Sequence, residues 1–287
     1  MKEIIINAGN GLGEAVIGTA VVREAAYEYG GPVRLLTKKY YGPYSNKGDQ
    51  RDKKNPMDVS FIDEPDAIWQ NNPYVDSIEW LPDDWSWPAD DKRHIHGIAF
   101  GHQIQNLCTK YGIFPIDGPE LTPDLHLSEE EDVKFRNLHG CIIFHVGGSG
   151  CPDDISKIKM FWDVLAAKLM KSTGRKIIQV GAEGFKISCA KQIRNTSLRD
   201  LFAIISQCHT YIGYDSGPTH IATAFNRKVY NLFHADELIK RFSNTRDLLG
   251  TIGSTHWYFY PQNNNFIVDN RFDRYNLIGN YIIKSMG

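Results

Sequence analysis

The sequence has little that would place it in a specialised class of protein. Its 287 residues include five cysteines, and no two of them form a C-x-x-C pair, so neither a disulfide framework nor a zinc site is expected. The formal net charge of −2 gives no overall attraction to nucleic acid or to a membrane. No apolar run approaches the roughly 18 residues that a membrane-spanning helix needs.

The sequence also lacks targeting and repeat signals. The opening MKEIIINAGN has one lysine and a short apolar run, without the longer apolar stretch of a signal peptide, so we expect a cytoplasmic protein. Neither an internal repeat nor a low-complexity tract is present. The length suits two domains, and the Pro- and acid-rich stretch PELTPDLHLSEEE indicates a boundary that gives domains of 1–130 and 131–287.

The first half of the chain begins with alternating strand and helix patterns. Apolar residues predict a strand at Lys2–Asn7, a glycine-rich turn, a helix at Glu14–Tyr29 and a strand at Val33–Thr37. A strand–helix–strand unit of this size implies parallel pairing. Further strands are expected at Val59–Ile62, Ser77–Leu81 and His96–Phe100, and a further helix at Gln103–Tyr111.

The second half repeats the alternation. The predicted strands are Cys141–Val146, Lys176–Val180, Tyr211–Tyr214 and Val229–Phe233, and the predicted helices include Ile158–Thr173 and Arg274–Met286. The final helix could return to the first domain. The whole pattern predicts an α/β protein of two Rossmann-like, doubly wound parallel sheets that face each other across a cleft.

The strongest local signal is the hexad DSGPTH between an apolar run and a helix. A helix N-terminus presents unpaired N–H groups and a partial positive charge, so it binds phosphate readily. Glycine lets backbone approach a ligand, and the hydroxyl and imidazole groups can donate to an anion. We expect the hexad to hold the diphosphate of a nucleotide-sugar. It comprises Asp215, Ser216, Gly217, Pro218, Thr219 and His220.

Two stretches carry a resemblance to a known family. TSLRDLFAIISQC followed by YIGYDSGPTHIATAFNRKVYNLF resembles the donor half of glycosyltransferase family 9, the ADP-heptose heptosyltransferases of lipopolysaccharide synthesis. The opening IIINAGNGLGEAVIGTAVVREAAYEYG and the segment NPYVD are similar to other parts of that family, whereas 38–54 and most of 83–135 match poorly. The resemblance implies a GT-B fold and an inverting glycosyltransferase with an N-terminal acceptor domain and a C-terminal donor domain.

The resemblance also implies which residues meet the donor. One of two lysines near a helix start would contact the phosphates, an acid after a strand would accept from the ribose hydroxyls, and Asp215 would orient its loop. Glycine-rich turns can form anion nests. Besides the hexad, the expected donor contacts are Gly148, Ser149, Lys157, Lys159, Gly181, Glu183, Ser197 and Leu198.

On the acceptor side, the family places an Asp where this chain has Glu14, at the first strand-to-helix junction. Such a carboxylate would take the proton from the attacking acceptor hydroxyl. A basic, aromatic loop over 38–54 could hold an anionic acceptor. The expected acceptor contacts are Asn10, Gly11, Gly13, Lys38 and Lys39.

Other ligands and activities are less well supported. GNGLG does not have the G-x-G-x-x-G spacing of a nicotinamide site, and no acid cluster indicates a metal, so we expect neither a cofactor nor a metal. The favoured donor is an ADP-sugar, with heptose as the sugar. The alternatives are a transferase acting on another anionic acceptor such as DNA, a nucleotide-sugar epimerase, and a non-catalytic nucleotide-sugar-binding protein.

Overall fold

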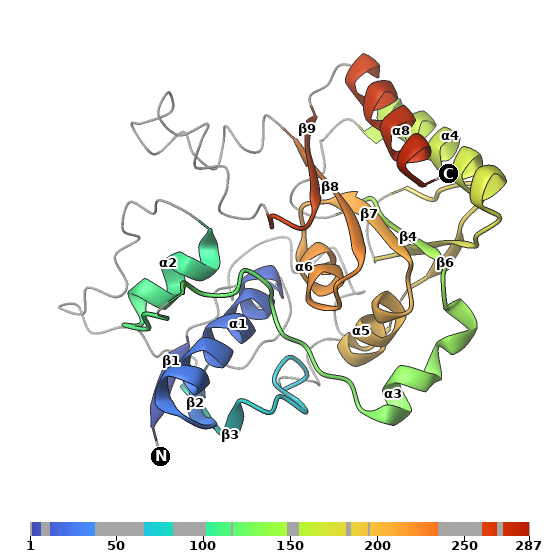
Figure 1. The fold of residues 1–287 in the computed structure, drawn as a ribbon. Helices are drawn as coiled ribbons and strands as arrows, with labels where there is room; N and C mark the ends of the chain where they lie inside the picture. Colours follow the sequence, from blue (N-terminus) through green and yellow to red (C-terminus); the bar gives the residue numbers. More distant parts are fainter. Residues whose placement is uncertain are drawn as a thin grey trace, which may run out of the picture. The chain divides into compact units, whose positions relative to one another are not determined.

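The computed structural model describes residues 2–6, 12–37, 66–82, 102–115, 117–147, 155–181, 185–194, 196–234, 260–268 and 272–286. The chain divides into two compact units, one of Met1–Ser128 with Leu249–Pro261 and the other of Glu129–Leu248 with Gln262–Gly287 (Figure 1). Each unit is an α/β structure with a parallel sheet, as the sequence predicts.

The first unit is built on a three-stranded parallel sheet in the order β1-β2-β3. Its strands are β1 (Glu3–Ile6), β2 (Val33–Thr37) and β3 (Val75–Trp80), and its helices are α1 (Leu12–Tyr29) and α2 (Gln103–Lys110).

Helix α1 connects the first two strands and is apolar over most of its length, and α2 packs against it. Helix α1 ends at Tyr29. The next residue, Gly30, has a positive φ of 77°, which lets the amides of Gly30 and Gly31 donate back to the carbonyls of Tyr27 and Ala26.

The second unit holds a six-stranded, wholly parallel sheet in the order β6-β5-β4-β7-β8-β9. The strands are β4 (Ile142–His145), β5 (Ile177–Val180), β6 (Lys191–Ile193), β7 (Thr210–Tyr214), β8 (Lys228–His234) and β9 (Asn264–Val268). The helical segments are α3 (Glu129–Lys134), η4 (Arg136–Leu138), α4 (Ile155–Thr173), α5 (Leu198–Ser206), α6 (Gly217–Ala224) and α8 (Phe272–Met286). The central strands are fully buried, as expected of a parallel sheet covered by helices.

The final helix belongs to the second unit. Helix α8 lies beside α4 (Figure 1), and the ring centroids of Tyr275 and Phe161 are 4.9 Å apart. The Tyr275 hydroxyl lies 3.0 Å from that of Tyr214 on β7. At Gly279 an added Cβ would meet the Phe161 ring at 3.1 Å, so the glycine allows this close approach. These contacts all lie within the second unit. The sequence alone leaves open whether the final helix returns to the first domain.

The boundary between the units also differs from the expected one. Leu249–Pro261 belongs to the first unit, although the sequence places all of 131–287 in the second domain. The reason lies in Tyr260, which is fully buried and whose ring centroid is 4.7 Å from that of His102 at the start of α2.

Most of the other predicted elements fall where the sequence indicated, within a few residues. The structure also contains two short strands, β6 and β9, that the sequence does not predict. The strands expected at Val59–Ile62 and His96–Phe100, and the basic loop over 38–54, lie outside the described residues. In the part of the chain that the structure describes, no helix is long and apolar enough to cross a membrane.

Candidate functional site

Three neighbouring strands of the second unit end at one edge of its sheet. Strand β4 pairs with β5 on one side and with β7 on the other, all parallel, so their carboxyl ends lie together. The residues there are His145 on β4, Gly181 after β5, and Asp215 and Ser216 after β7. Ligands of open α/β sheets bind at this edge. We call these four residues and the first turn of α6 the carboxyl-edge cluster.

Gly181 is required by the backbone and by its neighbour. Its φ of +104° is one that residues with a side chain rarely adopt. A Cβ at this position would lie 2.7 Å from Cδ2 and 2.8 Å from Nε2 of the His145 ring. The sequence predicts a donor contact at Gly181, and in the structure this glycine makes room for the His145 imidazole.

His145 is the cluster member that the sequence analysis missed. The side chain is 7% exposed, and its Nδ1 lies 3.1 Å from the Ser216 Oγ. The Ser216 hydroxyl donates to the Tyr214 carbonyl at 2.9 Å, so its single proton is already used. When both bonds form, His145 must donate from Nδ1, which leaves Nε2 without a proton. Burial lowers the pKa of His145 to about 4, so the ring is neutral near pH 7.

Helix α6 begins directly after the cluster and has no side-chain cap. Ser216 is its N-cap residue, but the Ser216 side chain makes no hydrogen bond to the first turn. Its hydroxyl is directed instead to His145 and Tyr214. Thr219 likewise donates its hydroxyl to the Tyr214 carbonyl at 3.0 Å. A first turn without a side-chain cap is suited to receive an anionic ligand in place of a cap.

Asp215 and His220 are brought together by the turn into α6. The Asp215 amide donates to the Leu232 carbonyl at 3.0 Å, which ties the end of β7 to β8. The His220 Nε2 lies 4.0 Å from the Asp215 Oδ1, and both side chains are buried, with 4% and 7% exposure. The hexad therefore sits at a strand-to-helix junction, as the sequence predicts, and its histidine lies against its aspartate.

The two candidate lysines have different surroundings. Lys159 donates to Asp163 one helical turn along α4, at 2.5 Å, and its side chain is 41% exposed. Asp163 also accepts from the Ser188 amide at 2.6 Å. The Lys159 ammonium group has two further N–H donors, so its role as a phosphate ligand stays a prediction. Lys157 lies in the first turn of α4, and its side chain is outside the described residues.

The remaining donor residues divide into two groups. Ser197 caps α5 by accepting the Asp200 amide at 3.0 Å, and Leu198 is fully buried. The Leu198 side chain is therefore part of the core, so a donor contact at this residue would have to come from its backbone. Gly148, Ser149 and Glu183 lie outside the described residues.

On the acceptor side, the structure describes part of the expected site. Glu14 is the third residue of α1 and follows β1, at the predicted junction, and its side chain is outside the described residues. Gly13 is already helical, because α1 begins at Leu12. Asn10, Gly11, Lys38 and Lys39 lie outside the described residues.

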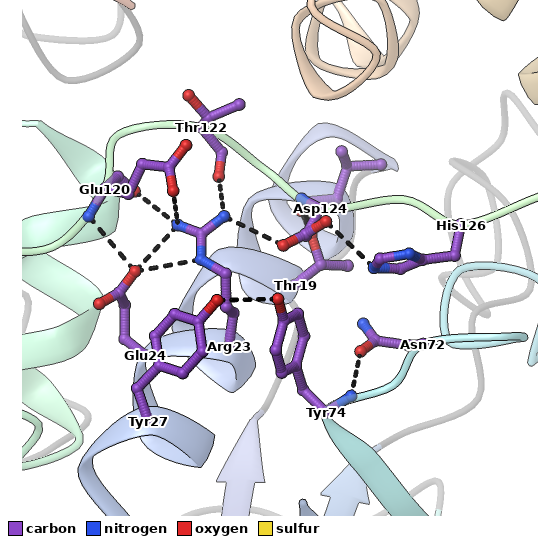
Figure 2. A network of polar contacts seen from close by, with 11 residues as sticks. Thr19, Arg23, Glu24, Tyr27, Asn72, Tyr74, Glu120, Thr122, Asp124 and His126 are labelled. Atoms are coloured by element: carbon purple, nitrogen blue, oxygen red, sulfur yellow. Dashed lines mark hydrogen bonds and ion pairs between the residues drawn. The ribbon is translucent and has the colours of Figure 1, made fainter.

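A buried polar network fixes α1 in the first unit (Figure 2). Arg23, 3% exposed, donates to the Asp124 carboxylate at 3.1 Å and to the backbone carbonyls of Thr122 and Glu120 at 2.9 and 3.0 Å. It also donates to Glu24 at 2.9 Å. Burial alone would lower the pKa of Arg23, but the hydrogen bond to Glu24 and the other nearby carboxylates leave it raised. The guanidinium therefore remains charged.

The same network extends to two further side chains. The His126 Nε2 lies 3.0 Å from the Asp124 Oδ1, and the Asp124 amide donates to the Thr19 hydroxyl at 2.7 Å. Burial opposes ionisation of Asp124, but the contacts with His126 and Arg23 lower its pKa overall. These contacts hold the segment 120–126 against α1 (Figure 2). The first turn of the same helix carries Glu14.

The burial of His145 predicts a pH dependence of stability. Its pKa is about 4 when folded and near 6.5 when unfolded, so the unfolded chain binds more protons between these values. The contribution is complete above about pH 6.5 and is lost as the pH falls toward 4. At about 1.4 kcal/mol per unit of pKa, the difference between the folded and unfolded pKa values of His145 corresponds to on the order of 3 kcal/mol of unfolding free energy.

Urea unfolding of wild type, His145→Gln and His139→Gln at pH 7 and pH 4.5 measures this effect. The pH dependence should weaken in His145→Gln alone, because His139 is exposed. An unchanged pH dependence in His145→Gln would show that the imidazole is not held neutral by burial.

Among the residues that the structure describes, the His, Cys, Asp and Glu side chains form no group of three or more that could hold a metal ion.

Part of the chain is similar to a known protein family, and its fold is similar to several solved structures. A family model described as glycosyltransferase family 9 (heptosyltransferase) matches residues 159–248. None of the curated proteins matches the chain.

Several solved structures are similar over nearly the whole chain. A family 9 glycosyl transferase from Veillonella parvula DSM 2008 has a TM-score of 0.60 at 12% identity, covering 99% of this chain and 89% of that one. The E. coli ADP-heptose lps heptosyltransferase II has a TM-score of 0.55 at 14% identity, covering 100% and 97%. E. coli heptosyltransferase WaaC with ADP has a TM-score of 0.53 at 10% identity, covering 99% and 98%.

At these identities the structural likeness establishes the fold, and the family match covers the stretch that contains the hexad. The chain therefore shares the fold of these structures, and its residues 159–248 are similar to glycosyltransferase family 9.

Proposed function

We propose that this protein is an inverting glycosyltransferase that moves a sugar from a nucleotide-diphosphate-sugar to an acceptor hydroxyl. The observation that carries the proposal is the carboxyl-edge cluster, where a helix without a side-chain cap begins beside small residues and a neutral, buried imidazole. The cluster lies partly within the segment that matches family 9. A helix N-terminus can stabilise the charge that develops on a departing diphosphate.

The proposed reaction is a single displacement. Glu14 takes the proton from the acceptor hydroxyl, and that oxygen attacks the anomeric carbon of the donor sugar. The bond from the anomeric carbon to the diphosphate oxygen breaks, and the diphosphate leaves with the electron pair toward the first turn of α6. Lys157 and Lys159 are the two candidates for offsetting its charge, and Lys159 also pairs with Asp163.

The choice of donor and acceptor follows from the similar structures. WaaC, whose solved structures include one with ADP and one with ADP-2-deoxy-2-fluoro heptose, shares the fold, which favours an ADP-linked, heptose-like sugar here. The likeness to an lps heptosyltransferase favours an acceptor in lipopolysaccharide or another surface glycan. We further propose that the reaction needs no metal, since the helix terminus and a lysine can take over the stabilisation of the leaving group.

A nucleotide panel tests the proposal. Thermal shift and calorimetry with ADP, GDP, UDP, CDP and ADP-heptose should show the largest stabilisation with the adenine ligands, about 2.7 kcal/mol at 100 times Kd. The stabilisation and the transfer of heptose should persist in excess EDTA. Absence of binding by every nucleotide diphosphate would refute the donor site, and activity that EDTA abolishes and magnesium or manganese restores would refute the metal-independent mechanism.

A further inference from the structure

The His145 ring at the end of β4 has one nitrogen that the fold leaves available. Its Nδ1 lies 3.1 Å from the Ser216 Oγ, and that hydroxyl lies 2.9 Å from the Tyr214 carbonyl oxygen. Each of these contacts needs a proton, because two lone pairs would otherwise face each other. Ser216 has one proton and the carbonyl can only accept, so the neutral ring carries its proton on Nδ1. The Nε2 atom is then a hydrogen-bond acceptor.

The Nε2 atom makes no hydrogen bond within the described part of the chain. The ring has no contact of this kind besides the one to Ser216. Trp162 provides a contrast, since its unpaired Nε1 is wholly enclosed by the core. The Nε2 of His145 is not one of the wholly enclosed unpaired atoms, and the residue is 7% exposed. A group that binds at this edge of the sheet can therefore reach it.

Gly181, the residue that follows β5, keeps this side of the ring uncovered. A Cβ at position 181 would lie 2.8 Å from the His145 Nε2 and 2.7 Å from its Cδ2, so any other residue would press against the same edge of the ring. Strand β5 pairs with β4 in parallel, which brings Gly181 and His145 to one edge of the sheet. The glycine therefore leaves space beside the nitrogen that has an unused lone pair.

The chemistry of this nitrogen restricts what it can bind. An imidazole nitrogen without a proton accepts hydrogen bonds and donates none, and the neutral ring adds no charge. A phosphate oxygen, which also only accepts, gains nothing from such a contact. The partner of Nε2 must carry a proton, as a hydroxyl or an N–H group does. His145 is therefore not itself an anion ligand, although it lies against Ser216 at the start of α6.

We infer that the His145 Nε2 accepts a hydrogen bond from a hydroxyl group of the nucleotide-sugar donor and so contributes to donor specificity. The inference rests on the proposed function, which places the diphosphate at the first turn of α6, next to Ser216. In a nucleotide-sugar, hydroxyls flank the diphosphate on both sides, on the ribose and on the transferred sugar, and the N–H groups of the base lie farther away. A buried acceptor matched to a hydroxyl rejects a ligand that lacks it.

Calorimetry with paired changes in protein and ligand tests the inference. Wild type, His145→Phe and His145→Gln are titrated with ADP, 2′-deoxy-ADP and 3′-deoxy-ADP, and with ADP-heptose and analogues in which fluorine replaces one sugar hydroxyl at a time. Phenylalanine keeps a planar ring and removes the acceptor, whereas the glutamine carbonyl provides an acceptor near the position of Nε2. The ADP analogues report on the ribose hydroxyls, and the fluorinated analogues report on those of the transferred sugar.

The wild type should bind the analogue that lacks the recognised hydroxyl roughly 5-fold more weakly than the parent ligand. His145→Phe should bind the two equally, and His145→Gln should restore part of the difference. A residue that only held Ser216 in place would affect all ligands alike. Equal affinity of the wild type for every analogue, or unchanged discrimination in a folded His145→Phe, would therefore overturn the inference.

Nitrogen NMR of the wild type with isotope-labelled histidine gives a result that does not depend on the folding of a variant. Nδ1 should carry the proton at pH 7, and the Nε2 resonance should shift when ADP or ADP-heptose binds at the recognised hydroxyl. A proton on Nε2, or an Nε2 resonance that neither ligand shifts, would contradict the inference. If no ligand of the panel binds, the proposed function fails and the inference with it, whereas normal binding without discrimination counts against the inference alone.

Discussion

Glu14→Gln is expected to lower kcat by roughly 10²–10⁴-fold, the usual contribution of a positioned general base. The substitution keeps the size of the side chain and removes the oxygen that would accept the proton. Glu14 lies in the first turn of α1, the helix that follows β1, where the resemblance to family 9 implies a catalytic carboxylate. The polar network around Arg23 holds this helix against the segment 120–126, so the turn is supported by a fixed framework.

Two further variants make the Glu14 experiment specific. Glu14→Asp restores the family's residue with a shorter reach and should keep partial activity. Glu28→Gln, near the other end of the same helix, is the matched control. Its side chain accepts the Phe114 amide at 2.7 Å, a bond that glutamine can also accept. Donor affinity should stay the same in all three. Near-normal turnover in Glu14→Gln would mean that another group is the base.

The parallel sheet of the second unit was predictable because the sequences of its central strands are mainly apolar. Tyr211–Tyr214 has no polar residue other than tyrosine, Val229–Phe233 is apolar except for Asn231, and both lie in buried strands of the structure. Strand β9 has the sequence NNFIV, in which two asparagines mask a strand that forms by pairing with β8. Strand β6 has only three residues and depends on β5. Such edge strands are set by their neighbours, which a local pattern does not contain.

The difference between local and long-range information also explains which parts of the candidate site could be predicted. The hexad is contiguous, so its place at a strand-to-helix junction could be predicted from the order of residues alone. The cluster around His145 is assembled from positions far apart in the chain, with Ser216 71 residues away. A histidine closing an apolar strand gives no local sign of such a partner. The ion pair between Lys159 and Asp163 could have been predicted, because the two residues are four positions apart on one helix face.

The first turn of α6 should determine donor affinity. Gly217→Val introduces a branched side chain at the first residue of the helix, directly after the N-cap Ser216, where the diphosphate is expected to approach the backbone. Nucleotide diphosphate affinity should fall at least ~10-fold by calorimetry, or about 1.4 kcal/mol. His220→Ala tests the buried histidine of the same turn, and a comparable fall is expected if its ring supports the anion site.

A glycine elsewhere separates this effect from a general cost of the substitution. Gly31 has no atom within 4 Å of the position that a Cβ would occupy, so Gly31→Val should leave donor affinity unchanged. Melting curves of all variants show whether the fold is retained, since only folded protein reports on the site. Wild-type affinity in a folded Gly217→Val and in a folded His220→Ala would move the diphosphate away from this turn. The proposed displacement would then need another group to stabilise its leaving oxygen.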